Sequence, residues 1–286
     1  MKKSLTLSLL LVAIATFSFS TNTVSAAPKA KGLVSIQKEI KKASPKQPII
    51  FSHRGSPYNA PEHSFAGYDN AIKDGSHFIE QDVWLSKDNK LYVTHDNNLK
   101  RTTGKNIEVS KSTSKQLSKV KLRNGEKLHQ LKDVFKHYQK NVHYIIEAKK
   151  NSGDNTDTEK ALATQLNKSK MNNNVIIQDT DIGGIELLHS FKPQKNVPYL
   201  WLMEASGEDQ YLENIKVAPS YITFLSLDAQ QATPKIIKAI HKRNMLSDLW
   251  TIQTYNDNYN AIKHNKADSI FTNNTKETKH LINKWK

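Results

Sequence analysis

The chain has 286 residues, no cysteine and a formal net charge of +15 at pH 7. The missing thiols exclude disulfide bonds and a lipid anchor on cysteine, and after residue 26 no apolar segment is long enough to cross a membrane. The charge indicates either contact with anionic lipid head groups or wall polymers, or only a lysine-rich surface, and dispersed lysines argue against a nucleic-acid partner.

Residues 1–26 have the pattern of a removable signal peptide. A basic start, Met1-Lys2-Lys3, precedes an apolar stretch over residues 5–19, and Val24-Ser25-Ala26 supplies the small residues of a cleavage site. We therefore expect a secreted protein, extracellular or associated with the cell wall, whose mature chain begins at Ala27.

Residues 27–48 are predicted to form a linker and an N-terminal helix. The helix has Ile36 and Ile40 on one face, and Pro45 and Pro48 end it before the first strand. Such a helix could close the bottom of a barrel. Residues 49–286 then form a single domain, because no flexible linker divides them and their length is typical of one (β/α)8 barrel.

Short apolar segments alternate with amphipathic helices after residue 49, which predicts an α/β fold with a parallel sheet, the (β/α)8 TIM barrel. The sequence has nine strand candidates, whereas a (β/α)8 barrel has eight strands, so one candidate is in excess. The weakest are residues 198–202 and 221–225. The others cover residues 49–52, 77–82, 91–96, 144–149, 175–178, 245–251 and 269–271.

The barrel is predicted to be irregular between its second and third strands. Residues 83–90 are too short for a crossover helix, so an extended return segment should replace it between parallel strands. Residues 97–143 form a small insertion after the third strand, an excursion within the same domain. The polar run 151–158 is predicted to be a flexible loop on the functional side.

Four of the strand candidates end on ionisable side chains. Side chains alternate along a strand, so Glu80 and Asp82 share a face, and so do Glu147 and Lys149. If the strands are parallel, their carboxyl ends meet at one edge of the sheet and these groups converge there. The full set comprises His53, Arg54, Glu80, Asp82, His95, Glu147 and Lys149.

Six motifs in register resemble those of the glycerophosphodiester phosphodiesterase family, over residues 49–274. The resemblance implies a TIM barrel, a divalent cation that is usually Ca2+ or Mg2+, and hydrolysis of glycerophosphodiesters to glycerol 3-phosphate and an alcohol. The motifs are His53-Arg54-Gly55, Pro61-Glu62-His63-Ser64, Glu80-Gln81-Asp82-Val83, His95-Asp96, Glu147-Ala148-Lys149 and Trp250-Thr251.

Glu80, Asp82 and Glu147 are the candidate metal ligands. Their carboxylates offer only oxygen, which suits one hard divalent cation. Three convergent acids without an ion would repel each other and their pKa values would rise. The alternative is three unrelated surface acids, each paired with a lysine.

His53 and His95 are the candidate catalytic residues, because imidazole exchanges protons near neutral pH. We favour His53 as the base that activates the nucleophile and His95 as the acid that protonates the leaving alkoxide. Alternatively, the two histidines only cap strand ends. The nucleophile is either water or the substrate's own glycerol hydroxyl, which would form a cyclic phosphate first.

Arg54, Lys149 and Trp250 are the candidate substrate-binding residues. The two cations would bind the non-bridging phosphate oxygens. Alternatively, Arg54 is a structural partner of Glu80 or Glu147, and Lys149 of Glu147. Trp250 ends a strand and is interpreted as pocket wall. Glu62 is interpreted as structural, because it follows Pro61 at an expected helix N-terminus; alternatively, it supports the residues that contact substrate or metal.

Three pairs of residues that shape the substrate side of the expected pocket depart from the family pattern. The family usually has Asn-Thr at His63-Ser64, often Ser-Phe at Asp179-Thr180, and usually Thr-Asp at Thr272-Asn273. Two rival functions therefore stay open. One is a phospholipase D-like enzyme acting on intact lipids, and the other is a non-catalytic basic protein that binds the cell wall.

Overall fold

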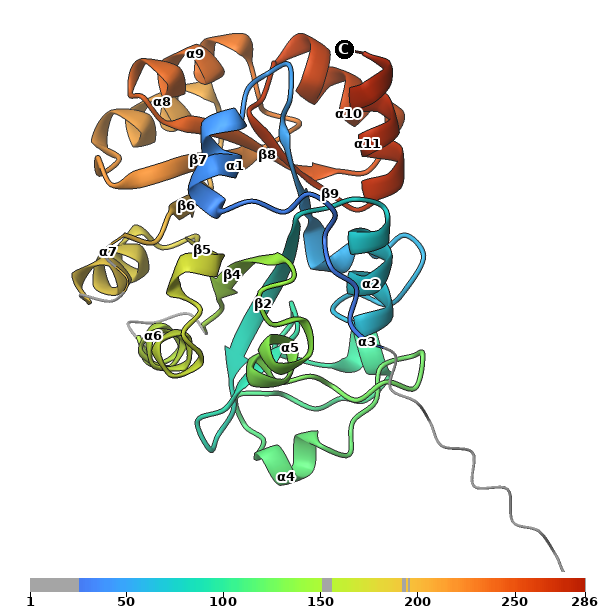
Figure 1. Ribbon diagram of the computed structural model, residues 1–286. Coiled ribbons are helices and arrows are strands. Elements are labelled where there is room, and N and C mark those ends of the chain that lie inside the picture. Colours follow the sequence, from blue (N-terminus) through green and yellow to red (C-terminus); the bar gives the residue numbers. More distant parts are fainter. Residues whose placement is uncertain (1–25, 151–155, 192–193, 195, 286) are drawn as a thin grey trace, which may run out of the picture.

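A computed structural model describes residues 26–150, 156–191, 194 and 196–285. Eight parallel strands close into a barrel surrounded by helices (Figure 1), because β1 pairs with both β9 and β2. The predicted TIM barrel is confirmed. The barrel strands are β1 (Ile49–Ser52), β2 (Phe78–Leu85), β4 (His143–Ala148), β5 (Val175–Asp179), β6 (Tyr199–Leu202), β7 (Ile222–Asp228), β8 (Leu246–Ile252) and β9 (Ser269–Thr272).

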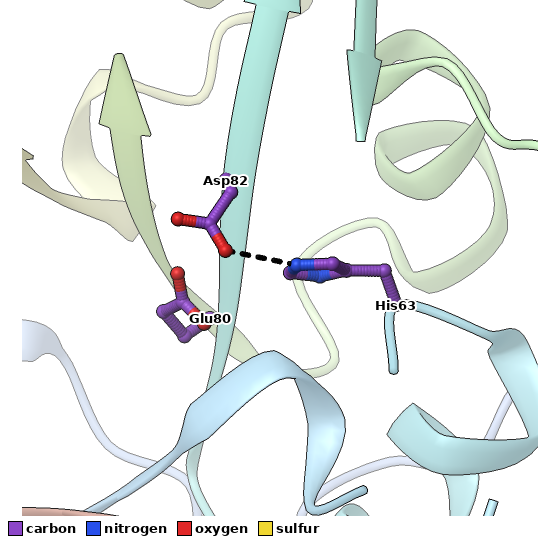
Figure 2. A group of neighbouring side chains, drawn as sticks. All are labelled: His63, Glu80 and Asp82. Carbon is purple, nitrogen blue, oxygen red and sulfur yellow. Dashed lines mark hydrogen bonds and ion pairs between the residues drawn. The ribbon is translucent and has the colours of Figure 1, made fainter. Parts of the chain in front are cut away.

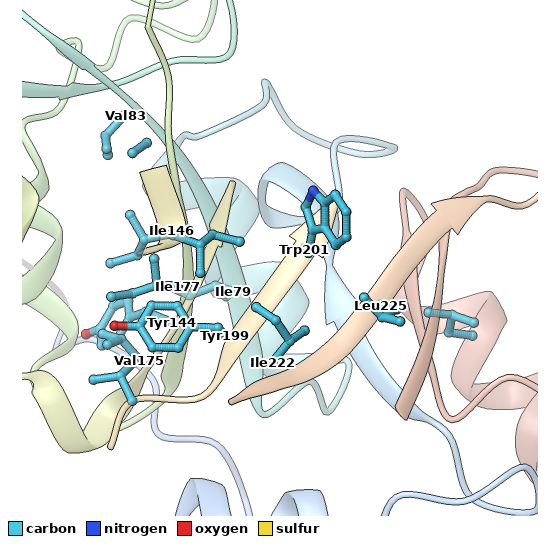
Figure 3. Packing of buried hydrophobic residues seen from close by; sticks show 14 of the residues in the cluster. Ile79, Val83, Tyr144, Ile146, Val175, Ile177, Tyr199, Trp201, Ile222 and Leu225 are labelled. Carbon is cyan, nitrogen blue, oxygen red and sulfur yellow. The ribbon is translucent and has the colours of Figure 1, made fainter. Parts of the chain in front are cut away.

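Helices cover the outer face of this barrel. Their apolar sides pack on the strand residues that point outward, and Figure 3 shows part of this layer, including Ile79, Tyr144 and Leu225. The helices of this outer layer are α2 (Phe65–Lys73), α5 (Leu131–Tyr138), α6 (Asp157–Ser169), α7 (Ile182–Ser190), α8 (Glu208–Val217), α9 (Pro234–Lys242), α10 (Tyr255–Tyr259) and α11 (Thr275–Lys284).

The inside of the barrel has an apolar lower layer and a polar upper layer. Phe51 lies at the centre of the lower layer, with its ring centroid 5.0 Å from that of Phe271 and 5.2 Å from that of Phe78. Because strand side chains alternate, Ile145 of β4 fills the lower layer and Glu147, two residues on, reaches the upper one. The barrel is therefore solid below its polar end.

The excess strand candidate is a real strand outside the barrel. β3 (Leu91–Val93) pairs antiparallel with the end of β2, so the expected extended return between parallel strands is wrong. A short turn, in which the Ser86 N–H donates to the carbonyl of Lys90, is enough for an antiparallel pair. The two strands regarded as weakest, β6 and β7, are both barrel strands.

The insertion after β3 has an apolar core of its own. Tyr92, Leu99, Val109 and Leu117 belong to this satellite core, which is separate from the two barrel cores. The insertion carries two short helices, α3 (Lys100–Thr103) and α4 (Ser114–Leu117), and α5 then returns to the barrel wall. The excursion predicted over residues 97–143 thus includes one regular barrel helix.

The lower end of the barrel is closed by α1 (Ile36–Lys42), as expected. Its Ile36 is fully buried against the lower apolar layer. The predicted signal peptide lies outside the described residues except for Ala26, and so do residues 151–155 of the predicted loop. In the part of the chain that the structure describes, no helix is long and apolar enough to span a bilayer.

Candidate active site

A cavity of about 240 Å³ opens at the carboxyl ends of the barrel strands. It brings together all the predicted site residues, although they are spread over nearly two hundred positions of the chain. The rest of the cavity lining consists mostly of neutral side chains, among them Gln178, Leu202 and Phe271. The predicted residues that line it are His53, Arg54, Glu80, Asp82, His95, Glu147, Lys149 and Trp250.

Strand register explains how the three acids meet. Glu80 and Asp82 are two residues apart on β2 and point into the barrel, and Asp82 lies opposite Glu147 on β4. Only 1% of Glu80, 1% of Asp82 and 5% of Glu147 is exposed. Such burial disfavours carboxylates unless positive charge accompanies them.

Lys149 and Arg54 supply part of that charge. The Lys149 ammonium lies 2.6 Å from Glu147 Oε1 and 3.3 Å from Asp82 Oδ1, so it bridges the two acids. Arg54 Nε is 3.6 Å from Asp82 Oδ2, and the Arg54 backbone N–H donates to Glu80 Oε2 at 2.7 Å. The alternative roles thus apply in part. Lys149 does pair with Glu147, but the Arg54 guanidinium pairs with Asp82 and Glu62 and not with Glu80 or Glu147.

The two cations do not stabilise the three carboxylates equally. Burial opposes ionisation of Asp82, but the Lys149 ammonium and the hydrogen bond from His63 hold its pKa well below the usual value. Burial and the neighbouring Asp82 charge raise the pKa of Glu80 well above its usual value. Burial also raises the pKa of Glu147 to about 8. The protein's own cations therefore leave the cluster short of positive charge.

This shortage and the donor atoms fit a hard divalent cation. The carboxylates of Glu80, Asp82 and Glu147 offer oxygen, and the buried amide oxygen of Gln178 has no hydrogen-bond partner among the described residues. Gln178 Nε2 donates to Glu80 Oε1 at 3.3 Å, so that amide borders the acids. These residues would hold the cation that the family resemblance implies.

His63 joins the acids from the loop before α2 (Figure 2). Its ring nitrogen, Glu80 and Asp82 offer ligand atoms within 4.8 Å of one another. In this structure Nε2 lies 3.0 Å from Asp82 Oδ2, and Nδ1 lies 3.0 Å from the Tyr68 hydroxyl. If that hydroxyl donates to Nδ1, Nε2 carries the proton and orients Asp82 instead of binding a metal. Sequence reasoning noted His63 only as a departure from the family motif.

His53 follows β1 in a single 3₁₀ turn, His53–Gly55. Its Nδ1 lies 2.6 Å from the amide oxygen of Asn273, which can only accept a hydrogen bond. This contact places the proton on Nδ1 and leaves Nε2 as an unprotonated acceptor. Burial, aided by the Arg54 charge, lowers the pKa of His53 to about 4. The geometry therefore suits a base.

His95 follows β3, so the hairpin formed by β2 and β3 brings it to the cavity. Its Nδ1 is 2.7 Å from Asp96 Oδ1, and the Trp84 indole N–H donates to its backbone carbonyl at 2.9 Å. Burial and the charges of Lys149 and Arg54 lower its pKa, while the Asp82 charge and the hydrogen bond to Asp96 oppose that shift. A carboxylate on Nδ1 stabilises the imidazolium, the form that an acid needs.

Glu62 and Trp250 complete the comparison with the predictions. The helix begins only at Phe65 with Ser64 as its N-cap, so the prediction that Glu62 lies in a helix N-terminus is wrong. Glu62 instead pairs with Arg54 and, more closely, with Arg101. Trp250 does line the cavity, and its buried indole N–H has no partner in the described structure.

Fold and site together define a TIM-barrel enzyme with a polar hydrolytic site at the carboxyl ends of its strands. A sequence model of the glycerophosphoryl diester phosphodiesterase family matches residues 53–277, so the chain belongs to that family. The predicted family is confirmed.

Individual relatives agree with this assignment. A glycerophosphodiester phosphodiesterase of Bacillus subtilis is 27% identical, with 96% of each chain covered. Two solved structures share the fold. A putative glycerophosphoryl diester phosphodiesterase of Silicibacter pomeroyi has a TM-score of 0.76 at 14% identity, covering 86% of this chain and 97% of that one. A phosphodiesterase of Oleispira antarctica, solved with the product sn-glycerol-3-phosphate, has a TM-score of 0.70 at 18% identity, covering 82% and 97%.

Proposed function

We propose that this enzyme hydrolyses glycerophosphodiesters to glycerol 3-phosphate and an alcohol, with one divalent cation, Ca2+ or Mg2+. The observation that carries the proposal is the gathering of two imidazoles, three buried carboxylates and two basic side chains around one cavity. The name of the Bacillus subtilis relative and the product held by the Oleispira antarctica protein support the same substrate class.

Each side chain then has a stated role. His53 Nε2 takes the proton of the nucleophile, and His95 gives a proton to the oxygen of the leaving alcohol. Arg54 and Lys149 stabilise the non-bridging phosphate oxygens, for which Lys149 must share its ammonium with the acids it now bridges. A cation held by Glu80, Asp82 and Glu147 would polarise the phosphate and acidify the attacking hydroxyl.

We also propose that the enzyme acts outside the cell or at the cell wall. The leader pattern of residues 1–26 and the net charge of +15 support this location. Substrates available there include deacylated phospholipid head groups and glycerol-phosphate wall polymer. An anionic polymer or lipid surface would also attract the basic protein without a specific site.

One assay separates this proposal from its rivals. Purified protein is incubated with glycerophosphocholine, intact phospholipid and glycerol-phosphate polymer, each with and without a chelator of divalent cations. Release of glycerol 3-phosphate that stops with chelator and returns with Ca2+ or Mg2+ supports the proposal. Cleavage of intact lipid alone would identify a phospholipase D-like enzyme, and binding without turnover would identify a wall-binding protein.

A further inference from the structure

Arg101 lies in the insertion after β3, on the short helix α3, and joins two acids that flank the cavity. Its Nε donates to Asp96 Oδ2 at 2.6 Å. Its two terminal nitrogens donate to Glu62 at 2.6 and 2.8 Å, which is a bidentate contact. Arg101 does not line the cavity, and 49% of its side chain is exposed.

Each of these two acids also contacts a side chain that lines the cavity. Asp96 Oδ1 is 2.7 Å from His95 Nδ1, so the Asp96 carboxylate lies between Arg101 and the imidazole. On the other side, Glu62 Oε2 accepts from Arg54 Nη1 at 3.4 Å. One guanidinium is thus connected to the candidate acid and, through a longer contact, to a candidate phosphate-binding arginine.

We propose that Arg101 is a positioning residue for protonation of the leaving alcohol. It fixes the orientation of Asp96, and Asp96 directs the imidazole of His95 toward the cavity and keeps a proton available on its Nε2. This inference rests on the proposed function. Sequence reasoning placed Arg101 only within the insertion over residues 97–143.

The proton balance of the step shows what Arg101 affects. The phosphorus–oxygen bond to the leaving alcohol breaks while a bond to the nucleophile's oxygen forms. The leaving oxygen takes the proton of His95 Nε2, and His53 takes the proton of the nucleophile. Arg101 acts most directly on the first of these transfers, because it contacts Asp96, the partner of His95, and has no hydrogen bond or ion pair with the described His53 or Asn273.

The leaving group therefore distinguishes this role from a structural one. Choline leaves as a strongly basic alkoxide that needs a proton, whereas p-nitrophenolate is stable without one. Arg101→Ala should lower kcat for glycerophosphocholine about 100-fold, the size of effect expected for general acid catalysis, with KM changed less than about threefold. For the p-nitrophenyl diester of glycerol 3-phosphate, kcat should fall less than about threefold.

Two further variants test the specificity of the effect. Lys100→Ala removes the neighbouring exposed charge from the same helix and should leave both rates unchanged. Arg101→Lys keeps the charge but cannot contact both acids with a planar fork, so it should recover only part of the loss. Thermal unfolding of each variant confirms that it is folded at the assay temperature.

The proposal is overturned by equal losses on the two substrates or by no loss at all. A double-mutant cycle gives a second test: Asp96→Ala combined with Arg101→Ala should be no slower than Asp96→Ala alone, and multiplied losses would show independent roles. If the unaltered protein cleaves neither diester with Ca2+ or Mg2+, the proposed function fails first. Normal turnover by the unaltered protein with an Arg101→Ala that keeps its rate refutes this inference alone.

Discussion

The two histidines of the cavity have contrasting surroundings. His53 follows a barrel strand, and its Nδ1 contacts the neutral amide of Asn273 at 2.6 Å. His95 follows a strand outside the barrel, and its Nδ1 contacts the carboxylate of Asp96 at 2.7 Å. Both imidazoles are oriented through the same nitrogen, but only one of the two partners carries a charge.

This difference supports opposite roles in one reaction. A neutral amide oxygen fixes the tautomer of an imidazole and favours its charged form only weakly, whereas a carboxylate favours the imidazolium strongly. Pairs of titratable groups whose environments separate their pKa values identify the base and the acid of a site. The partners thus agree with His53 as base and His95 as acid, and five substitutions test this contrast and the site around it.

Removing the base should have the largest effect. We expect His53→Ala to lower kcat for glycerophosphocholine about 1000-fold, because general base catalysis is lost while the fold keeps its other contacts. The exposed His280 on α11 provides a control, and His280→Ala should keep full activity. A residual rate within tenfold of the unaltered enzyme would contradict the role of His53.

Replacing Asp82, the central acid, should weaken cation binding and should leave the two catalytic histidines in place. Asp82 contacts His63, Arg54 and Lys149, so Asp82→Asn should weaken binding of Ca2+ or Mg2+ about 100-fold in calorimetric titration and reduce turnover accordingly. Glu213→Gln, at a side chain 68% exposed on α8, should change neither. Unchanged affinity in Asp82→Asn would remove the metal role from this cluster.

Exchanging the neutral partner for a charged one tests the contrast directly. His53 must be unprotonated to act, and its pKa of about 4 keeps it so down to low pH. Asn273→Asp should raise that pKa by about one unit or more, because the new carboxylate favours the imidazolium. The acid limb of kcat/KM should move to higher pH, with about a tenfold loss at pH 4 and little change at pH 8.

The reciprocal variant should move the other limb. Asp96→Asn removes the charge that favours protonated His95, so the alkaline limb should move to lower pH. Both profiles are measured with glycerophosphocholine under saturating cation. If the two variants shift the same limb, the assignment of base and acid from their partners is wrong.

The smallest effect is expected at Trp250, which lies on β8 and lines the cavity. Its buried indole N–H has no partner in the described structure, so we expect it to donate to bound substrate. Trp250→Phe keeps most of the ring and loses one neutral hydrogen bond, which should raise KM about fivefold and leave kcat nearly unchanged. An unchanged KM would show that the Trp250 indole N–H donates no hydrogen bond to the substrate.

The candidate site was largely predictable where strand geometry decides it. Alternation along β2 and β4 places Glu80, Asp82 and Glu147 at one end of a parallel sheet. His95 also reaches that end, although the expected parallel third strand is an antiparallel hairpin. The hairpin leads back to the rim of the cavity, so a wrong strand direction still gave the right location.

The partners of the site residues were not predictable, because they depend on ring closure and on the insertion. Asn273 lies 220 positions from His53 and meets it only because β9 pairs with β1. Arg101 reaches Glu62 only because the satellite core fixes the insertion beside the barrel. The departures at His63 and Asn273 were the available signal, and each proves to lie beside a candidate functional residue.

The position of β3 outside the barrel has a consequence for how activity is lost. His95 depends on a hairpin and a small satellite core, whereas the barrel has two cores of its own. Small peripheral units open at a lower cost in free energy than the global fold. In increasing urea, turnover should therefore disappear before the far-ultraviolet circular dichroism of the barrel changes, and backbone amides of the insertion should exchange with deuterium faster than those of β4 to β8.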